Sequence, residues 1–460
     1  MGTATYDALE TELLGHVEGP GDPGYEEARQ IYNAMIDKCP AAIVSCMDSA
    51  DVMAAVNSGR EQGLDIAVRG GGHSGAGFCL VDGGMTIDLA PMHGVRVDPA
   101  ARTAQVEGGA LLAGLDHATH AFGLGVPAGI MSTTGVGGLT LGGGHGYLTR
   151  KYGLTIDSLL AADVVLADGS FVTADENRNA DLFWALRGGG GNFGIVTSFT
   201  FRLHPVDTVG MGVTLWPVER TPEVLRWYRE FLPNAPEDVY GFFALMSVPP
   251  APPFPEEIHG RKMCGVVWCH TGGPERMEDA IASVAEPGPP AFHFTAPMPY
   301  PQLQSMFDGL IPKGLQWYWR GDFFDRISDE AIDVHAEFGA AMPTHLSMMH
   351  LYPVDGAAHR VGKDDTAWGY RDAMWSGVFG GIDPDPANAG IIRDWCVAYW
   401  EALHPYSMGG AYVNFMMEEG QERVRATYRD HYDRLAEVKG RYDPGNLFHA
   451  NQNIRPAPQP

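Results

Sequence analysis

The stretch that decides the fold is AVRGGGHSGAG, residues 67–77. It reads as a buried strand that runs directly into a glycine turn around a single histidine, His73. Glycine lets backbone N–H groups point into a concavity with no side chain in the way, and such a nest holds phosphate oxygens. Two further glycine clusters follow, GVGGLTLGGGHG at 135–146 and GGGGNFG at 188–194. We therefore expect the first half of the chain to bind a pyrophosphate group.

A dinucleotide-binding Rossmann turn is the main alternative for these glycines. The spacing G-x-G-x-x-G occurs at 70–75 after a strand, and Asp88 follows at about the 20-residue distance that this fingerprint requires. The fingerprint also requires a helix to open at the third glycine, whereas 76–84 (AGFCLVDGG) has no helical period. The same spacing at 189–194 leads into a strand. The context of both matches therefore excludes a Rossmann turn.

Composition limits the function classes. The chain has 460 residues, enough for two domains, and a formal net charge of −26 without clusters of Lys and Arg, which argues against binding to nucleic acid or anionic membranes. The six cysteines are scattered and the histidines lack metal-ligand spacing, so we expect no metal site. Neither a signal peptide nor an apolar run of about 20 residues is visible, which predicts a cytoplasmic protein without membrane spans.

Four segments carry a family resemblance and occur in the family's order. Together they resemble the berberine-bridge-enzyme-like (BBE-like) branch of the vanillyl-alcohol-oxidase flavoproteins, with a PCMH-type FAD-binding domain, and in particular its bacterial members with one covalent flavin link. The segments are AVRGGGHSGAG (67–77), GVGGLTLGGGHGYLTRKYGLTIDSLL (135–160), DLFWALRGGGGNFGIVTSF (181–199) and YDPGNLFHANQNI (442–454).

The resemblance implies an α+β fold of two domains. Residues 1–205 would form the FAD-binding domain, and 206–410 a substrate-binding domain with an antiparallel sheet covered by helices. Residues 411–460 would return to the FAD domain. The local patterns add a helix at 25–39 and a strand around Tyr412.

The resemblance also implies FAD attached covalently through His73, where a neutral imidazole attacks the quinone-methide form of the flavin. Many members add a second link from a cysteine shortly before the second glycine cluster, but Met131 occupies that place, so we expect a single link. The residues expected to bind FAD lie within or beside the four segments. They are Arg69, Gly70, Gly71, Gly72, His73, Ser74, Gly77, Thr133, Thr134, Gly135, Gly137, Gly138, Gly142, His145, Gly146, Gly191, Gly194, Ile195, Val196 and Asn451.

The implied reaction is oxidation of a small organic alcohol, amine or phenolic or polyketide-type substrate by hydride transfer to flavin N5, with O2 as acceptor and H2O2 as product. Relatives often take the substrate proton with a tyrosine in a Y-x-N-Y segment. Here 412–415 reads Tyr-Val-Asn-Phe, so Phe415 lacks that hydroxyl and the base stays unassigned. The candidate catalytic residues are Tyr412, Asn414, Tyr318, Asp322 and His350, with Tyr352 as a further possible base and Arg320 as an anion anchor.

Two alternatives stay open. A favorskiase-like, flavin-dependent oxygenase of specialised metabolism, which uses an oxygenated flavin, shares the YVNF segment and a threonine, Thr134, before the second glycine cluster. A catalytically silent flavin- or ligand-binding protein is the non-enzymatic alternative, although His73 and all the glycine loops argue against it. The sequence identifies neither the substrate nor the oligomeric state.

Overall fold

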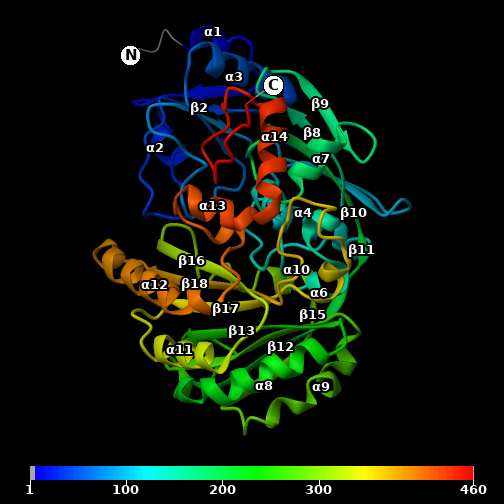
Figure 1. Ribbon diagram of the computed structural model, residues 1–460, viewed down its shortest axis with the longest axis vertical. Helices are drawn as coiled ribbons and strands as arrows, with labels where there is room; N and C mark the ends of the chain where they lie inside the picture. The colour runs from blue at the N-terminus through cyan, green and yellow to red at the C-terminus, as the bar shows by residue number, and fades with distance from the viewer. Residues whose placement is uncertain (1–5, 459–460) are drawn as a thin grey trace.

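The computed structural model describes residues 6–458, and these form an α+β fold in which the first and the last described residues lie in the same half of the molecule (Figure 1). A four-stranded and a five-stranded sheet occupy the half that contains both ends, and a seven-stranded sheet occupies the other half. Between them lies a two-stranded pair of β7 (Leu124–Gly125) and β11 (His204–Pro205). The α+β fold class expected from the sequence is confirmed.

The four-stranded sheet carries the decisive glycine turn at the end of one strand. Its order is β1 (His16–Glu18), β2 (Ala42–Ser45), β4 (Met85–Asp88) and β3 (Ile66–Arg69). β2 and β3 both run parallel to β4, and every residue of β2 and β4 is buried, which explains their continuous apolar sequence. No helix follows β3, because the chain passes through the glycine turn directly into β4.

The five-stranded sheet is antiparallel and packs beside the first. Its order is β5 (Val95–Asp98), β6 (Thr103–Glu107), β10 (Ile195–Arg202), β8 (Leu159–Val165) and β9 (Phe171–Asp175). The third glycine cluster ends where β10 begins, which confirms that a strand and not a helix follows it.

The seven-stranded sheet is antiparallel throughout. Its order is β15 (Phe292–Pro299), β12 (Thr208–Pro217), β14 (Lys262–His270), β13 (Val239–Ser247), β17 (Met348–Pro353), β18 (Trp375–Asp383) and β16 (Gln316–Phe324). Consecutive residues of a strand face opposite sides, so Phe243 packs among the covering helices while Phe242 faces the other half of the molecule. The face toward the other half is therefore free to form a binding site.

The helices fall into two groups (Figure 1). Those that cover the outer face of the seven-stranded sheet are α8 (Thr221–Asn234), α11 (Asp329–Ala340) and α12 (Ala389–Leu403), with the short α9 (Met277–Ala280) beside α8. The others are α1 (Asp7–Glu10), α2 (Tyr25–Ala28), α3 (Ser49–Glu61), α4 (Leu112–His120), α5 (Val136–Gly142), α6 (Thr149–Tyr152), α7 (Ala180–Leu186), α10 (Tyr300–Gln304), α13 (Gln421–Tyr428) and α14 (Tyr432–Tyr442). Among the described residues, no helix combines the length and apolar character needed to cross a membrane.

Two expected elements are wrong. The helix expected at 25–39 stops after one turn as α2, because the backbone beyond it bonds to distant segments: Tyr32 N–H donates to Gly72 and Ala34 N–H to Leu315. The strand expected around Tyr412 is a short 3-10 helix, Val413–Phe415. Tertiary contacts override the local pattern at both places.

Candidate active site

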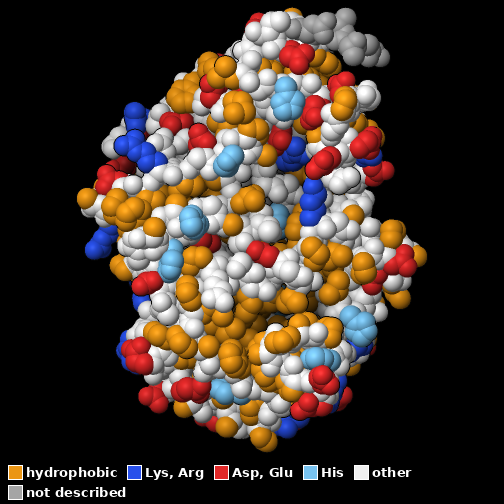
Figure 2. All heavy atoms as spheres, turned by 180° about the vertical axis from the view of Figure 1, so that it is seen from behind, with side chains coloured by type: hydrophobic (Ala, Val, Ile, Leu, Met, Phe, Trp, Pro, Cys, Tyr) orange, Lys and Arg blue, Asp and Glu red, His pale blue; other side chains and the backbone are white. Residues whose placement is uncertain are grey.

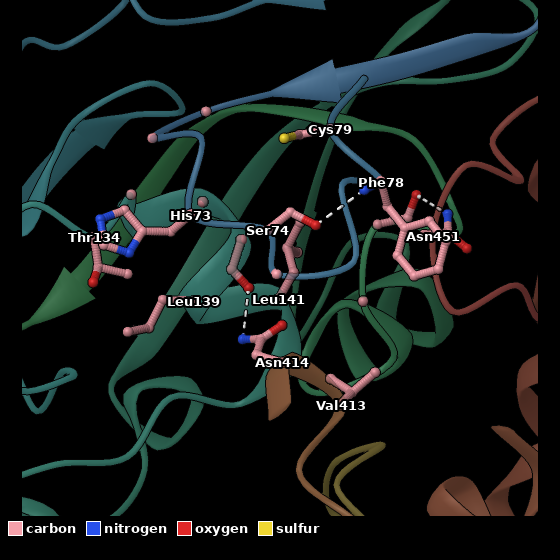
Figure 3. A pocket seen from close by; sticks show the side chains of 18 of the residues that line it. His73, Ser74, Phe78, Cys79, Thr134, Leu139, Leu141, Val413, Asn414 and Asn451 are labelled. Atoms are coloured by element: carbon pink, nitrogen blue, oxygen red, sulfur yellow. Dashed lines mark hydrogen bonds between the residues drawn. The ribbon is translucent and has the colours of Figure 1, made fainter. Parts of the chain in front are cut away.

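A cavity of about 370 Å³ lies between the glycine loops and the inner face of the seven-stranded sheet. One wall consists of the three glycine clusters and the C-terminal segment around Asn451, and the opposite wall consists of side chains from β16, β17 and β18. Figure 3 shows His73, Ser74 and Asn414 around this space, contributed by segments far apart in the sequence. The volume lies in the range of small-molecule sites.

The first glycine loop places His73 at the cavity wall in a fixed orientation. The His73 ring stacks on Tyr32 with centroids 3.9 Å apart and planes 22° apart, and its Nε2 lies 2.9 Å from the Thr133 hydroxyl. Burial lowers the pKa of His73 to about 4, so the imidazole is neutral at pH 7. In the tautomer whose Nε2–H donates to the Thr133 hydroxyl, Nδ1 carries the free electron pair of a nucleophile.

The glycine loops meet backbone to backbone. A Cβ atom on Gly71 would collide with the backbone of Gly135, and one on Gly135 would collide with Gly71. Gly138 and Gly191 also line the cavity, and a Cβ on either would meet no atom within 4 Å. These two residues therefore leave space on the ligand side, as a nest for an extended cofactor requires.

Several buried polar atoms on the cavity wall have no hydrogen-bond partner in the described part of the chain. They are Nδ1 and Nε2 of His145, Oδ1 of Asn451 and the indole nitrogens of Trp317 and Trp319. Burying a polar group without a partner costs free energy, so these atoms are positioned for a ligand. Donors and acceptors at both ends of a long cavity fit FAD, which carries polar groups along its whole length.

Most residues expected to bind FAD line this cavity. They are Gly70, Gly71, Gly72, His73, Ser74, Thr134, Gly135, Gly137, Gly138, His145, Gly191, Gly194, Ile195, Val196 and Asn451. Each of these residues is therefore placed where it can contact a bound cofactor.

Five of the expected residues do not line the cavity, and each has a different structural partner. Arg69 forms a buried ion pair with Asp88, the residue that a Rossmann fold would direct at a ribose. Thr133 contacts His73. At Gly77, Gly142 and Gly146 an added Cβ would collide with Ile36, Asn414 and Ala128 respectively, so these glycines permit close packing behind the wall.

Three of the candidate groups lie on the face of β16 that points away from the cavity. Trp317 and Trp319 line the cavity, and alternation directs Tyr318, Arg320 and Asp322 to the opposite side of the sheet. Neither Tyr318 nor Asp322 can therefore serve as base, and Arg320 cannot anchor an anion in the cavity.

The three groups have partners of their own. Asp322 is fully buried in ion pairs with Arg423 and His404. Arg320 lies 2.6 Å from Glu419 and its guanidinium donates to the Tyr318 hydroxyl. These contacts connect β16 to the C-terminal segment and hold the three groups on the face away from the cavity.

Tyr412 and Asn414 line the cavity but bond to each other and to the glycine loop. The Asn414 amide donates to the Tyr412 oxygen (2.8 Å) and to the Gly138 carbonyl (3.1 Å, dashed in Figure 3). The Gly144 N–H also donates to the Tyr412 oxygen, at 3.2 Å. Two donors thus occupy the acceptor sites of this phenol.

His350 and Tyr352 lie two residues apart on β17 and both face the cavity. The His350 Nδ1 lies 2.7 Å from the Tyr352 hydroxyl. Burial lowers the pKa of His350 to about 3 and raises the pKa of Tyr352, so both groups are neutral at pH 7. The Tyr352 ring lies 5.8 Å from the Phe415 ring, where relatives place a second tyrosine.

Two sulfur side chains lie on the cavity wall. Met131, at the place expected for a cysteine in doubly linked relatives, lines the cavity and packs against Tyr32 and Trp317. Cys79 also lines it, but burial raises the pKa of its thiol to about 11. A protonated thiol is a poor nucleophile.

Other lining residues were not expected from the sequence. Tyr32 comes from the segment predicted to be a helix, and its backbone contacts place it over the glycine loop. The alternation of β16 and β17 predicts one shared face, but nothing in either strand says which face meets the cavity. The unexpected residues include Tyr32, Gly75, Phe78, Phe307, Ile311, Met348 and Val378. Trp317 and Trp319 belong to the aromatic run whose sequence favours an organic, partly apolar substrate, and both line the cavity.

Comparisons with known proteins agree with this arrangement. The family model "FAD binding domain" matches residues 40–175, and the model "Berberine and berberine like" matches 411–455. An FAD-linked oxidoreductase of Dictyostelium discoideum is 32% identical over 94% of this chain and 93% of its own. Glucooligosaccharide oxidase of Sarocladium strictum is 28% identical over 94% of this chain and 91% of its own.

A solved structure of 6-hydroxy-D-nicotine oxidase from Arthrobacter nicotinovorans covers 97% of this chain and 98% of its own, with a TM-score of 0.85 at 25% identity. The match extends over both halves of the molecule, including the sheet that forms the second wall of the cavity. The similarity to the Dictyostelium relative, over nearly the full length of both chains, is high enough to assign the family. The chain therefore belongs to the berberine-bridge-enzyme-like family of FAD-linked oxidoreductases and is an FAD-binding enzyme.

Proposed function

We propose that this enzyme is an oxidase that carries FAD on one covalent link from His73 and oxidises a small organic substrate held against the seven-stranded sheet. O2 is the electron acceptor and H2O2 the second product. One observation carries the proposal: a single cavity joins the neutral His73 imidazole and the glycine loops to an aromatic wall with a hydrogen-bonded His350–Tyr352 pair. When bound, FAD supplies a two-electron acceptor for a C–H bond.

This arrangement supports a division of the chain into an FAD-binding part and a substrate-binding part. Residues 1–205 and the return segment 411–460 would hold FAD, since both contribute to the wall that contains the glycine loops. Residues 206–410 would bind substrate, since this segment contains the whole seven-stranded sheet.

The geometry around His73 supports the single link. Thr133 engages Nε2, so Nδ1 is the nitrogen available for a bond to the flavin. Met131 has no nucleophilic group, and Cys79 is a neutral thiol. Relatives named as oxidases of a glucooligosaccharide and of 6-hydroxy-D-nicotine support an oxidase without choosing its substrate.

Acid precipitation tests the link. Purified wild type, His73→Ala and a control, His93→Ala, are denatured and precipitated, and the flavin absorbance of pellet and supernatant is measured. His93 is exposed and does not line the cavity. We expect flavin in the pellet of wild type and His93→Ala and in the supernatant of His73→Ala. Flavin in the supernatant of wild type would falsify the covalent link.

The oxidase half is tested without a substrate. Dithionite reduces the flavin anaerobically, O2 is admitted, and the return of flavin absorbance and the H2O2 formed are recorded. We expect complete reoxidation with one H2O2 per flavin. A reduced flavin that persists in air while an artificial acceptor reoxidises it would identify a dehydrogenase.

A favorskiase-like oxygenase is the second candidate, favoured by Phe415, which places no hydroxyl beside His145 and Tyr352. The two reactions differ in the fate of oxygen. Oxidation under 18O2 with the label recovered in the organic product, and not in H2O2, would establish the oxygenase.

A further inference from the structure

The substrate end of the cavity carries no formal charge. Among the described lining residues there is no Asp, Glu, Lys or Arg. The three lining histidines are neutral at pH 7, because burial lowers the pKa of His73 to about 4 and those of His145 and His350 to about 3. A charged substrate would lose its hydration here without gaining a counter-charge, which is costly.

The wall formed by the seven-stranded sheet is apolar and aromatic. It includes Met348, Val378, Trp317 and Trp319, and Phe307 and Ile311 close it from the segment after α10. Figure 2 shows the molecule from behind, where hydrophobic side chains gather around a hollow in the lower half of the surface. A chain of sugar hydroxyls would find few partners on this wall, and each unpaired hydroxyl costs free energy.

Tyr352 is the polar group on this wall that has acceptor capacity to spare. In the tautomer with hydrogen on Nε2, the Tyr352 hydroxyl donates a hydrogen bond to Nδ1 of His350, at 2.7 Å. No other described group bonds to the Tyr352 oxygen, whereas the Tyr412 oxygen already accepts from Asn414 and Gly144. The phenol of Tyr352 can therefore accept one further hydrogen bond from a substrate hydroxyl.

We infer that this site oxidises an uncharged, ring-bearing alcohol, and that Tyr352 accepts the hydroxyl proton as its own proton passes to His350. This inference rests on the proposed function. The substrate O–H bond breaks and its proton moves to the Tyr352 oxygen. The C–H bond on the same carbon breaks, and its hydrogen leaves with the electron pair to FAD as the C=O bond forms. O2 then takes the two electrons and two protons, so alcohol and O2 give carbonyl compound and H2O2.

This assignment excludes an amine as the preferred substrate on chemical grounds. A simple amine is an ammonium ion at pH 7, so it would enter this site without a counter-charge or would first have to lose its proton. Asp322 lies on the other face of the sheet in an ion pair with Arg423, and Asp308, beside Phe307, accepts hydrogen bonds from Ser132. An uncharged hydroxyl matches the neutral Tyr352–His350 pair without that cost.

Four probes test the substrate class on the FAD-loaded enzyme. Benzyl alcohol, benzoate and benzylammonium share one ring and differ in charge, and cellobiose represents a sugar. Binding is followed by perturbation of the flavin absorbance, and reaction by anaerobic bleaching of the flavin. We expect benzyl alcohol to bind at least about tenfold more tightly than either ion and to bleach the flavin, with no perturbation by cellobiose. A dissociation constant for an ion or for cellobiose at or below that of benzyl alcohol overturns the inference, as does the absence of any response to benzyl alcohol.

Substitutions test the proton acceptor with the same probe. Tyr352→Phe should lower the rate of bleaching by benzyl alcohol about 10²–10⁴-fold, because the proton transfer is lost. Its binding should weaken far less, by about tenfold, because one hydrogen bond to the substrate hydroxyl is lost as well. Tyr240→Phe is the matched control, a buried β13 tyrosine whose hydroxyl has no partner among the described residues and which does not line the cavity. Equal rates in Tyr352→Phe and Tyr240→Phe would exclude Tyr352 as base.

His350 is a positioning residue, and pH separates its role from a structural one. In wild type the neutral pair is present throughout the neutral range, so the bleaching rate should not depend on pH there. In His350→Asn the phenol has no proton acceptor and must ionise, so the rate should rise with pH. A flat profile in His350→Asn overturns the relay. Covalent flavin and reoxidation by O2 are measured on every variant, so a failure of the proposed function is seen separately from a failure of this inference.

Discussion

The His73 imidazole is held by two neighbours from different parts of the chain. Tyr32, from the segment before β2, covers one face of the ring, and Thr133, just before the second glycine cluster, engages Nε2. The two contacts restrict the plane of the ring and its rotation. Orientation of this kind raises the rate of a bond-forming step by holding the reacting atoms in place.

Substitution of Thr133 tests this orientation. Thr133→Val keeps the shape of the side chain and removes the hydroxyl, so apo-protein supplied with FAD should form the covalent link more slowly, by about tenfold or more. The measurement is the fraction of flavin in the acid pellet against time. Thr208→Val, at an exposed position at the start of β12, is the control and should match wild type. An unchanged rate in Thr133→Val would show that Nε2 needs no partner for the reaction.

At the scale of the elements, α14 connects two segments of the cavity wall that contains the glycine loops. The Lys439 ammonium, fully buried, donates to the carbonyls of Asn192 (2.6 Å) and Phe448 (2.9 Å) and pairs with Asp443 at 2.6 Å. Asp443 in turn accepts from the backbone of Leu447 and Phe448. Because Asn192 and Phe448 both line the cavity, this one side chain connects the third glycine cluster to the C-terminal segment.

Removal of this cation should therefore weaken both the fold and FAD binding. Lys439→Met leaves Asp443 buried without its partner, and breaking a buried pair in this way costs about 3–5 kcal/mol of unfolding free energy. Urea unfolding and the flavin retained after dialysis report the two effects. The control is Lys363→Met, because the exposed pair of Lys363 with Asp430 contributes little to stability. Similar losses in both variants would mean that the network around Lys439 does not stabilise the site.

The strand β16 shows how far the sequence predicts such a site. The aromatic run at 315–324 predicts a strand, and the structure has one at Gln316–Phe324. Its alternation separates Trp317 and Trp319 from Tyr318 and Asp322, but the choice of face depends on what packs against each side. On one side of β16, α12 and the ion pair with Arg423 cover Asp322. Arg423 is 101 residues away from Asp322 in sequence.

The same limit applies to the glycine loops and to the catalytic pair. The glycines predict a pyrophosphate nest because the backbone requirements are local, and the resemblance of the four segments to the family adds FAD and the role of His73. The segment after α2 has a helical pattern and yet stays irregular, since its hydrogen bonds go to Gly72 and Leu315. The His350–Tyr352 pair requires only an i, i+2 spacing on a strand, and it acquires meaning only once that face is known to meet the cavity.

For the whole molecule, the cavity depends on contacts that join its two halves. Asn33 donates to the carbonyls of Gly75 (2.8 Å) and Trp317 (3.0 Å), so it connects the first glycine loop to β16. Arg150 pairs with Asp355 at 2.8 Å on the other side of the junction. A third contact, between α4 and α10, places Asp116 opposite Gln304. The Asp116 carboxylate oxygens are buried there without a hydrogen-bond partner in the described part of the chain.

Asp116 makes this junction sensitive to pH. Burial raises the pKa of its carboxyl to about 7, a rise that the nearby Gln304 amide partly opposes, and the un-ionised Tyr300 hydroxyl lies close by. In the unfolded chain the pKa of an aspartate is about 3.9. Between these values the folded protein holds a proton that the unfolded protein has lost, so stability falls as pH rises from about 4 to about 7. Above that range the full cost of a buried carboxylate is present.

Asp116→Asn removes the titration and keeps the size of the side chain, so the variant should be more stable than wild type at about pH 8 and gain least at about pH 4. Thermal unfolding at both pH values measures the difference, and it should reach several degrees at the higher pH because a buried charge is lost. Asp333→Asn, on the exposed side of α11, controls for the change in net charge. Parallel pH profiles in wild type and Asp116→Asn would mean that the pKa of Asp116 is the same in the folded and the unfolded protein. The α4–α10 contact would then admit water at both pH values and would not bury this carboxyl.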